Sequence, residues 1–185
     1  MTHSENHSDL KRLALVGVLA AMSLVLELFV HFPLLPSADF LLYSPGDVPI
    51  ILAAVLIGPA AGLTAAFINA SLFVLLTGKG GPWGALMHFA SSGGMALVIG
   101  WVSRKTDKRW IPMIAGVATR VILMVPLNML ITPIYTGASS SVVMKMIVPA
   151  IIPFNFIHAG INTILSCIVM KVLPSKVLDQ FRRTV

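Results

Sequence analysis

Several polar side chains of this chain stand inside long apolar runs, and these residues are the most able to do chemistry. Arg120 lies about nine residues into the apolar run 111–132, roughly 14 Å along a helix that rises about 1.5 Å per residue. If the run crosses a bilayer, the charge lies near the midplane, where it costs several kcal/mol unless it faces a partner or a wet cavity. Arg120 is therefore either a ligand or coupling contact, or an interior arginine satisfied by helix-end carbonyls.

A second group of polar residues lies on the last two apolar runs. Asn155 and His158 are three residues apart and share one helix face, which Asn162 continues one turn further. Asn128 lies on the preceding, antiparallel run. Amide and imidazole groups offer hydrogen-bond donors and acceptors with little fixed charge, which suits a small-molecule site. The alternative is hydrogen bonding between the helices, worth about 0.6 kcal/mol per pair. Pro153 favours the ligand site because it disturbs the helix beside Asn155.

Two polar segments supply further candidates. Segments 37–47 and 77–83 contain charged residues, glycine and proline, and are predicted to be external loops at the mouth of a cavity. Tyr43 and Trp83 are candidate ligand contacts there, although aromatic residues at this level also form an interfacial belt. The same segments and the start of the next predicted helix offer further possible ligand contacts: Asp39, Phe40, Asp47 and His88.

Signatures of an enzyme are missing from the sequence. There is no glycine-rich phosphate loop ending in Gly-Lys-Ser/Thr, no His-Glu-x-x-His zinc pair and no workably spaced Ser/His/Asp set. The single cysteine, Cys167, excludes an internal disulfide and makes a cysteine-built metal site improbable. We therefore expect no catalytic activity, no metal and no cofactor.

Composition identifies the elements that must position these side chains. The chain of 185 residues is 57% hydrophobic and 11% charged, with a mean hydropathy of +0.91, whereas a soluble domain carries roughly 25% charged residues. At about 20 apolar residues per membrane-spanning helix, the chain supplies roughly six spans and short loops. We therefore predict an all-α membrane protein without a separate globular domain.

The distribution of basic residues decides how the spans are counted. Residues 48–76 carry no charge but are interrupted at Gly58-Pro59, so they form either one kinked span or two short spans. Two spans place ten of the Lys and Arg residues on one side and only Lys79 and Lys145 on the other. Basic loops stay in the cytoplasm, which favours six spans with both termini cytoplasmic. The basic residues are then topological anchors, and nucleic acid is not an expected partner.

The domain organisation follows from this count. A six-helix domain is predicted over residues 11–173, between a polar cytoplasmic tail at 1–10 and a basic cytoplasmic tail at 174–185. The remaining spans are expected at about 13–30, 84–102, 111–132 and 147–172, separated by loops that include 103–110 and 133–146.

Three motifs give the chain a family resemblance. They are SPGDVPIILAAVLIGPAAG (44–62), PLNMLITPIY (126–135) and IIPFNFIHAGIN (151–162). With them the chain, from Lys11 to about Leu173, resembles the substrate-binding S component of an energy-coupling factor (ECF) vitamin transporter, closest to the riboflavin-specific members. The resemblance implies a six-helix S-component bundle in the plasma membrane of a prokaryote.

The resemblance also implies roles for individual residues. Asn128 and Asn155 match positions that hydrogen-bond the flavin ring, and Leu41 to Tyr43 match an external loop that packs on the ligand. Gly17 and Ala21 match a small-residue motif that docks on a transmembrane T subunit. Two ATPase subunits would complete the importer.

Two positions depart from the riboflavin pattern and keep alternatives open. His158 stands where the family motif has lysine, and Arg120 stands where the riboflavin members have an apolar residue. An arginine facing the cavity suits an anionic vitamin such as pantothenate. A stand-alone secondary transporter is the other alternative, but such proteins usually have related halves, and residues 1–92 and 93–185 show no such relation.

Overall fold

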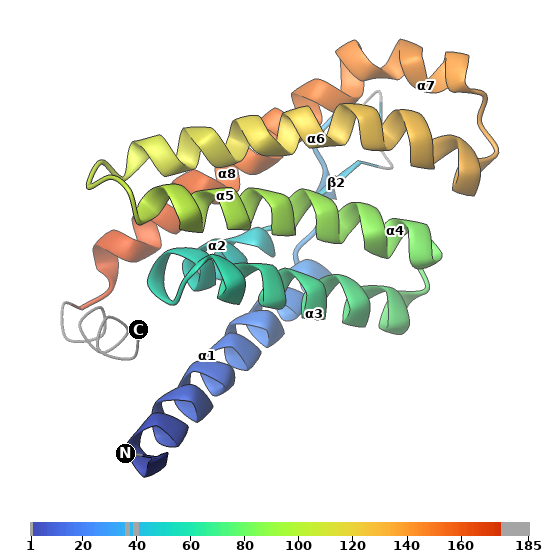
Figure 1. The fold of residues 1–185 in the computed structure, drawn as a ribbon. Coiled ribbons are helices and arrows are strands. Elements are labelled where there is room, and N and C mark those ends of the chain that lie inside the picture. Colours follow the sequence, from blue (N-terminus) through green and yellow to red (C-terminus); the bar gives the residue numbers. More distant parts are fainter. Residues whose placement is uncertain (1, 36–37, 39–40, 175–185) are drawn as a thin grey trace.

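The apolar runs form a bundle of helices with one small hairpin (Figure 1). The computed structural model describes residues 2–35, 38 and 41–174. The hairpin pairs β1 (Phe32–Pro33) with β2 (Leu42–Tyr43) in antiparallel register. The helices, with two π-helical turns named η, are α1 (Thr2–Phe29), α2 (Asp47–Leu56), α3 (Pro59–Thr77), α4 (Gly81–His88), η1 (Phe89–Gly93), α5 (Gly94–Ser103), α6 (Trp110–Thr136), α7 (Ser140–Met146), η2 (Ile147–Ile151) and α8 (Ile152–Val172).

Five long helical elements and the short helix α2 make up the six-helix bundle that the sequence predicted. Helix α4 continues through η1 into α5, and α7 continues through η2 into α8 (Figure 1). Within the described residues, five helical segments are long and apolar enough to cross a membrane. Helix α2 is also apolar but has only 10 residues, or about 15 Å of helix. It therefore crosses only part of a bilayer core about 30 Å thick.

The turn at Gly58-Pro59 confirms two helices in residues 48–76. Gly58 separates α2 from α3 with φ of 144°, a conformation that favours glycine. Pro59 occupies the first turn of α3, where its missing N–H breaks no helical bond. A side chain at position 58 would also collide with the Arg104 guanidinium.

Helices extend beyond some of the predicted span limits. The predicted loop 133–146 is mostly helical, because α6 continues to Thr136 and α7 begins at Ser140. Likewise, α1 begins at Thr2, so the polar segment 1–10 is helical from its second residue. Hydropathy marks where a chain leaves the apolar layer, whereas a helix can continue past that level. Residues 175–185 of the predicted C-terminal tail lie outside the described residues.

Small residues allow the central helices to approach closely. Helices α2, α3 and α5 pack together, with Ala53, Ala65 and Ala96 fully buried. A Cβ atom on Gly100 would lie 2.8 Å from the Ala54 carbonyl oxygen. Lipid chains are as apolar as the helices, so close van der Waals packing of this kind stabilises such a bundle.

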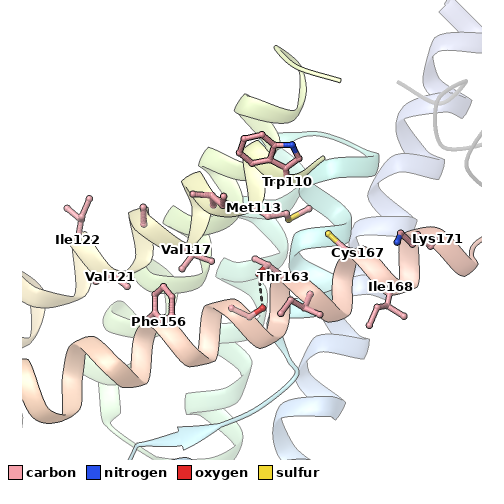
Figure 2. A pocket seen from close by; sticks show the side chains of 14 residues that line it. Trp110, Met113, Val117, Val121, Ile122, Phe156, Thr163, Cys167, Ile168 and Lys171 are labelled. Atoms are coloured by element: carbon pink, nitrogen blue, oxygen red, sulfur yellow. Dashed lines mark hydrogen bonds between the residues drawn. The ribbon is translucent and has the colours of Figure 1, made fainter. Parts of the chain in front are cut away.

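A large apolar groove lies between α6 and α8 (Figure 2). It measures about 750 Å³, with Trp110 and Lys171 at one end and Ile122 and Phe156 at the other. The Thr163 hydroxyl in its wall donates to the Gly160 carbonyl at 2.9 Å. None of the polar residues predicted to bind a ligand lines this groove, so the candidate site lies elsewhere.

Candidate ligand-binding site

A second cavity collects the polar residues of the bundle. Its volume of about 320 Å³ is at the lower end of the range for small-molecule sites. Lys79 and Gly80, in the α3–α4 connection, contribute to its wall. Its other polar lining residues come from α1, the segment before α2, α2, α4, η1, α6 and α8: Glu27, Ser44, Asp47, His88, Ser91, Arg120, Asn128, Thr132, Asn155 and His158.

Arg120 is the hub of the polar network in this cavity. Its Nη1 donates to Asp47 Oδ2 at 2.5 Å, and its Nε donates to Asn155 Oδ1 at 3.1 Å. Its Nη2 lies 3.0 Å from His158 Nδ1. Arg120 and Asp47 are only 5% and 3% exposed, so the arginine charge is matched by a buried carboxylate. Of the two interpretations of Arg120, the described contacts favour an interior arginine, but its partners are side chains and not the helix-end carbonyls that were expected. Arg120 also lines the cavity.

Asp47 reaches this depth because the chain before α2 enters the bundle. Both His158 Nε2 and Asn162 Nδ2 contact the Ser44 carbonyl oxygen, at 3.1 and 3.0 Å. These contacts satisfy non-helical backbone that lipid could not solvate. Residues 43–47 belong to the segment that was predicted to be an external loop at the cavity mouth, and Tyr43, Ser44 and Asp47 of this segment are buried.

The contacts of His158 specify its tautomer. A guanidinium can only donate hydrogen bonds, so Nδ1 of His158 accepts from Arg120 and carries no proton. Nε2 then carries the proton and donates to the Ser44 carbonyl. His158 is therefore a neutral connector between α6 and the buried segment before α2.

Asn128 and Asn155 keep unused hydrogen-bonding capacity beside the cavity. Asn128 donates to the Met124 carbonyl at 2.7 Å and accepts from Thr132. Asn155 donates to the carbonyl of Ile151 at 2.8 Å and accepts from Arg120. Ile151 is the last residue of η2. An amide has two N–H donors and two acceptor lone pairs. Within the part of the chain that the structure describes, each side chain therefore retains one donor and one acceptor for a ligand edge that offers both.

The remaining predicted contacts fall in different places. Leu41 lines the cavity, whereas the Tyr43 ring packs on His158 with centroids 5.2 Å apart. Trp83 lies in the first turn of α4, is 42% exposed and is not among the lining residues. Asp39 and Phe40 lie outside the described residues.

Sequence reasoning gave too little weight to two carboxylates. Asp47 was assigned to a loop, and Glu27 was not among the predicted site residues. In the bundle, Glu27 Oε1 lies 3.1 Å from His88 Nδ1, and both residues line the cavity. The available signal was the need of every buried charge for a partner, but sequence spacing does not tell which helices meet.

Gly17 and Ala21 lie on an open face of α1. Both are exposed, and a Cβ atom on Gly17 would meet nothing within 4 Å. The face is therefore free within the described chain, as a docking surface requires. Its role in docking remains a prediction.

Comparison with known proteins identifies the family. The model of the ECF-type riboflavin transporter S component matches residues 7–176. The chain belongs to this family. The riboflavin transporter FmnP of Bacillus subtilis (strain 168) is 30% identical over 89% of this chain and 93% of its own length. The riboflavin transporter RibU of Lactococcus lactis subsp. cremoris (strain NZ9000) is 27% identical over 93% of this chain and 87% of its own length.

A solved structure supports the same assignment. The S component of a bacterial ECF transporter matches with a TM-score of 0.77 and 26% identity, over 88% of this chain and 95% of that chain. The S-component bundle expected from the sequence motifs is thus confirmed. The chain is a multi-pass membrane protein of a transporter family whose S components are non-catalytic, substrate-binding subunits.

Proposed function

We propose that this S component binds riboflavin in the 320 Å³ cavity, with Asn128 and Asn155 hydrogen-bonding the flavin ring. The observation that carries the proposal is the free donor and acceptor on each of these two amides. The imide edge of a flavin alternates C=O and N–H groups and complements such amides. Leu41, Met87 and Phe154 supply apolar surface for the ring.

Charge balance in the cavity favours a neutral vitamin. Riboflavin is uncharged, and the positive charge of Arg120 is matched by Asp47 at 2.5 Å. Pantothenate would bring a carboxylate, and the Lys and Arg residues among the described lining residues are Arg120, which is paired with Asp47, and the exposed Lys79. An unpaired Arg120 was the main reason for considering pantothenate, so that reason is weakened. The two departures from the riboflavin pattern are also in contact, because the Arg120 guanidinium lies against His158. Arg120 thus supplies a cation close to the position where the family motif has lysine.

Calorimetry of the purified protein tests the site. The unsubstituted protein should bind riboflavin and not pantothenate. Asn128→Ala and Asn155→Ala should each weaken riboflavin binding about tenfold or more, because a lost hydrogen bond to a buried partner costs about 1–3 kcal/mol. Ile122→Ala, on the exposed side of α6, is the matched control and should bind normally. Failure of riboflavin to bind the unsubstituted protein would refute the proposal.

Transport would require partners that this chain does not supply. We propose that Gly17 and Ala21 dock on a transmembrane T subunit and that two ATPase subunits provide the energy. Both termini would then lie in the cytoplasm of a prokaryote, with the riboflavin cavity opening outward. The open small-residue face of α1 and the basic residues of the 103–110 loop support this arrangement.

A further inference from the structure

His88 and Glu27 form a second polar pair in the cavity, separate from the network around Arg120. They come from α4 and α1, whereas Arg120, Asn128, Asn155 and His158 come from α6 and α8. Nδ1 of His88 lies 3.1 Å from Glu27 Oε1, and the two side chains are 20% and 12% exposed. The Phe73 ring meets the imidazole edge to face at 6.1 Å. The imidazole is thus held from two sides at the cavity wall.

The nearby carboxylate determines what His88 presents to the cavity. An unprotonated Nδ1 would place its lone pair against a carboxylate oxygen, so the proton belongs on Nδ1. In the neutral ring, Nε2 is then left as an acceptor. Within the described residues, Nε2 of His88 has no hydrogen-bond partner. It is also not one of the fully buried side-chain atoms that lack a partner, so it keeps some accessible surface. His88 therefore lines the cavity with Nε2 unpartnered among the described residues, and this nitrogen is an acceptor when the ring is neutral. His158, in contrast, uses both ring nitrogens within the protein.

The chemistry of a flavin decides which ligand group matches this acceptor. The oxidised ring system has a single imide N–H, and the amides of Asn128 and Asn155 compete for it. The other donors of riboflavin are the hydroxyls of its ribityl chain. We propose that His88 accepts a hydrogen bond from a ribityl hydroxyl and that Glu27 positions His88 for this contact. The inference rests on riboflavin binding in this cavity, and it assigns ring and ribityl chain to different parts of the wall.

A ligand without the ribityl chain tests the assignment. Lumiflavin has the same ring system with a methyl group in place of ribityl. His88→Phe keeps a flat ring but removes the acceptor, so it should weaken riboflavin binding about tenfold and leave lumiflavin binding unchanged. His88→Gln keeps an acceptor and should restore much of the riboflavin affinity. Leu86→Ala, an exposed neighbour on α4, should change neither affinity.

The positioning role of Glu27 is tested by comparing two ligands, because general damage to the fold would weaken the binding of both. Glu27→Gln should lower the ratio of riboflavin affinity to lumiflavin affinity, since a misplaced imidazole affects only the ribityl contact. Equal weakening of both ligands by His88→Phe, or no change in either, would overturn the inference while riboflavin binding by the unsubstituted protein still stands. Absence of that binding would overturn the proposed function, and the inference with it.

Discussion

Arg120 acts on the cavity through other side chains. Its three nitrogens contact Asp47, Asn155 and His158, so one residue of α6 joins α2 to α8. Two of the residues that it contacts were expected to meet the ligand directly. The arginine therefore sets the positions of Asn155 and His158, and the buried carboxylate makes its charge tolerable in the bundle.

Removing only one partner of the Arg120–Asp47 ion pair should lower the stability of the protein more than removing both charges. Arg120→Gln leaves Asp47 buried without its cation, and Asp47→Asn leaves Arg120 without its anion. Each change should cost about 3–5 kcal/mol of stability, because an uncompensated charge remains buried. The double variant should be more stable than either single variant.

Thermal unfolding in detergent, with riboflavin affinity measured on the same samples, follows both effects. Additive losses in the double variant would show that the two charges are not coupled. Ile114→Ala, at an exposed position of α6, provides a control that should unfold like the unsubstituted protein.

Helix α2 shows what the sequence of an element reveals and what it does not. The turn at Gly58-Pro59 was predictable, because glycine and proline impose local backbone geometry. The depth of its N-terminus was not, because Asp47 and its polar neighbours have the composition of an exposed loop. Their burial depends on Arg120, His158 and Asn162, which are distant in sequence. Nonlocal hydrogen bonds of this kind leave no periodic pattern.

Two glycines separate the effects of packing and helix propensity. Gly100 of α5 faces the Ala54 carbonyl and Pro59, and a Cβ atom would lie 2.8 Å from each. Gly100→Ala should therefore destabilise the bundle by about 1–3 kcal/mol, as overpacking does. Gly160 of α8 has no atom within 4 Å of its Cβ position, so Gly160→Ala should be neutral or slightly stabilising. Thermal unfolding compares the two, and equal midpoints would contradict the packing argument.

At the scale of the whole molecule, the polar cavity and the apolar groove lie between different sets of helices. The polar cavity lies where six helices and the chain before α2 converge, while the larger apolar groove is formed by α6 and α8 alone (Figure 2). The grouping of Asn155 with His158 was predictable from helix periodicity. The pairing of Glu27 with His88 was not, since it depends on how α1 meets α4 in three dimensions.

Membrane orientation can be tested with two cysteines. In a Cys167→Ser background, Thr106→Cys should react with a membrane-impermeant thiol reagent only from the cytoplasmic side. Ser140→Cys should react only from the outside, because an odd number of spans separates the two positions. The ten-to-two division of basic residues supports this orientation. Labelling of both positions from one side would contradict the six-span topology.

The open face of α1 should matter for uptake and not for ligand binding. Gly17 and Ala21 are exposed and are not among the lining residues of the polar cavity. Gly17→Leu or Ala21→Leu should prevent close approach of a partner helix. Either change should therefore abolish riboflavin uptake by cells, while the purified variant binds riboflavin normally.

Ala118→Leu is the control, because it adds the same bulk to another exposed alanine, which lines the apolar groove between α6 and α8. It should leave uptake intact. Loss of binding in the α1 variants would show that this face supports the cavity, and equal loss of uptake in Ala118→Leu would show that added bulk anywhere on the surface is harmful. Normal uptake in both α1 variants would place the docking surface on another part of the bundle.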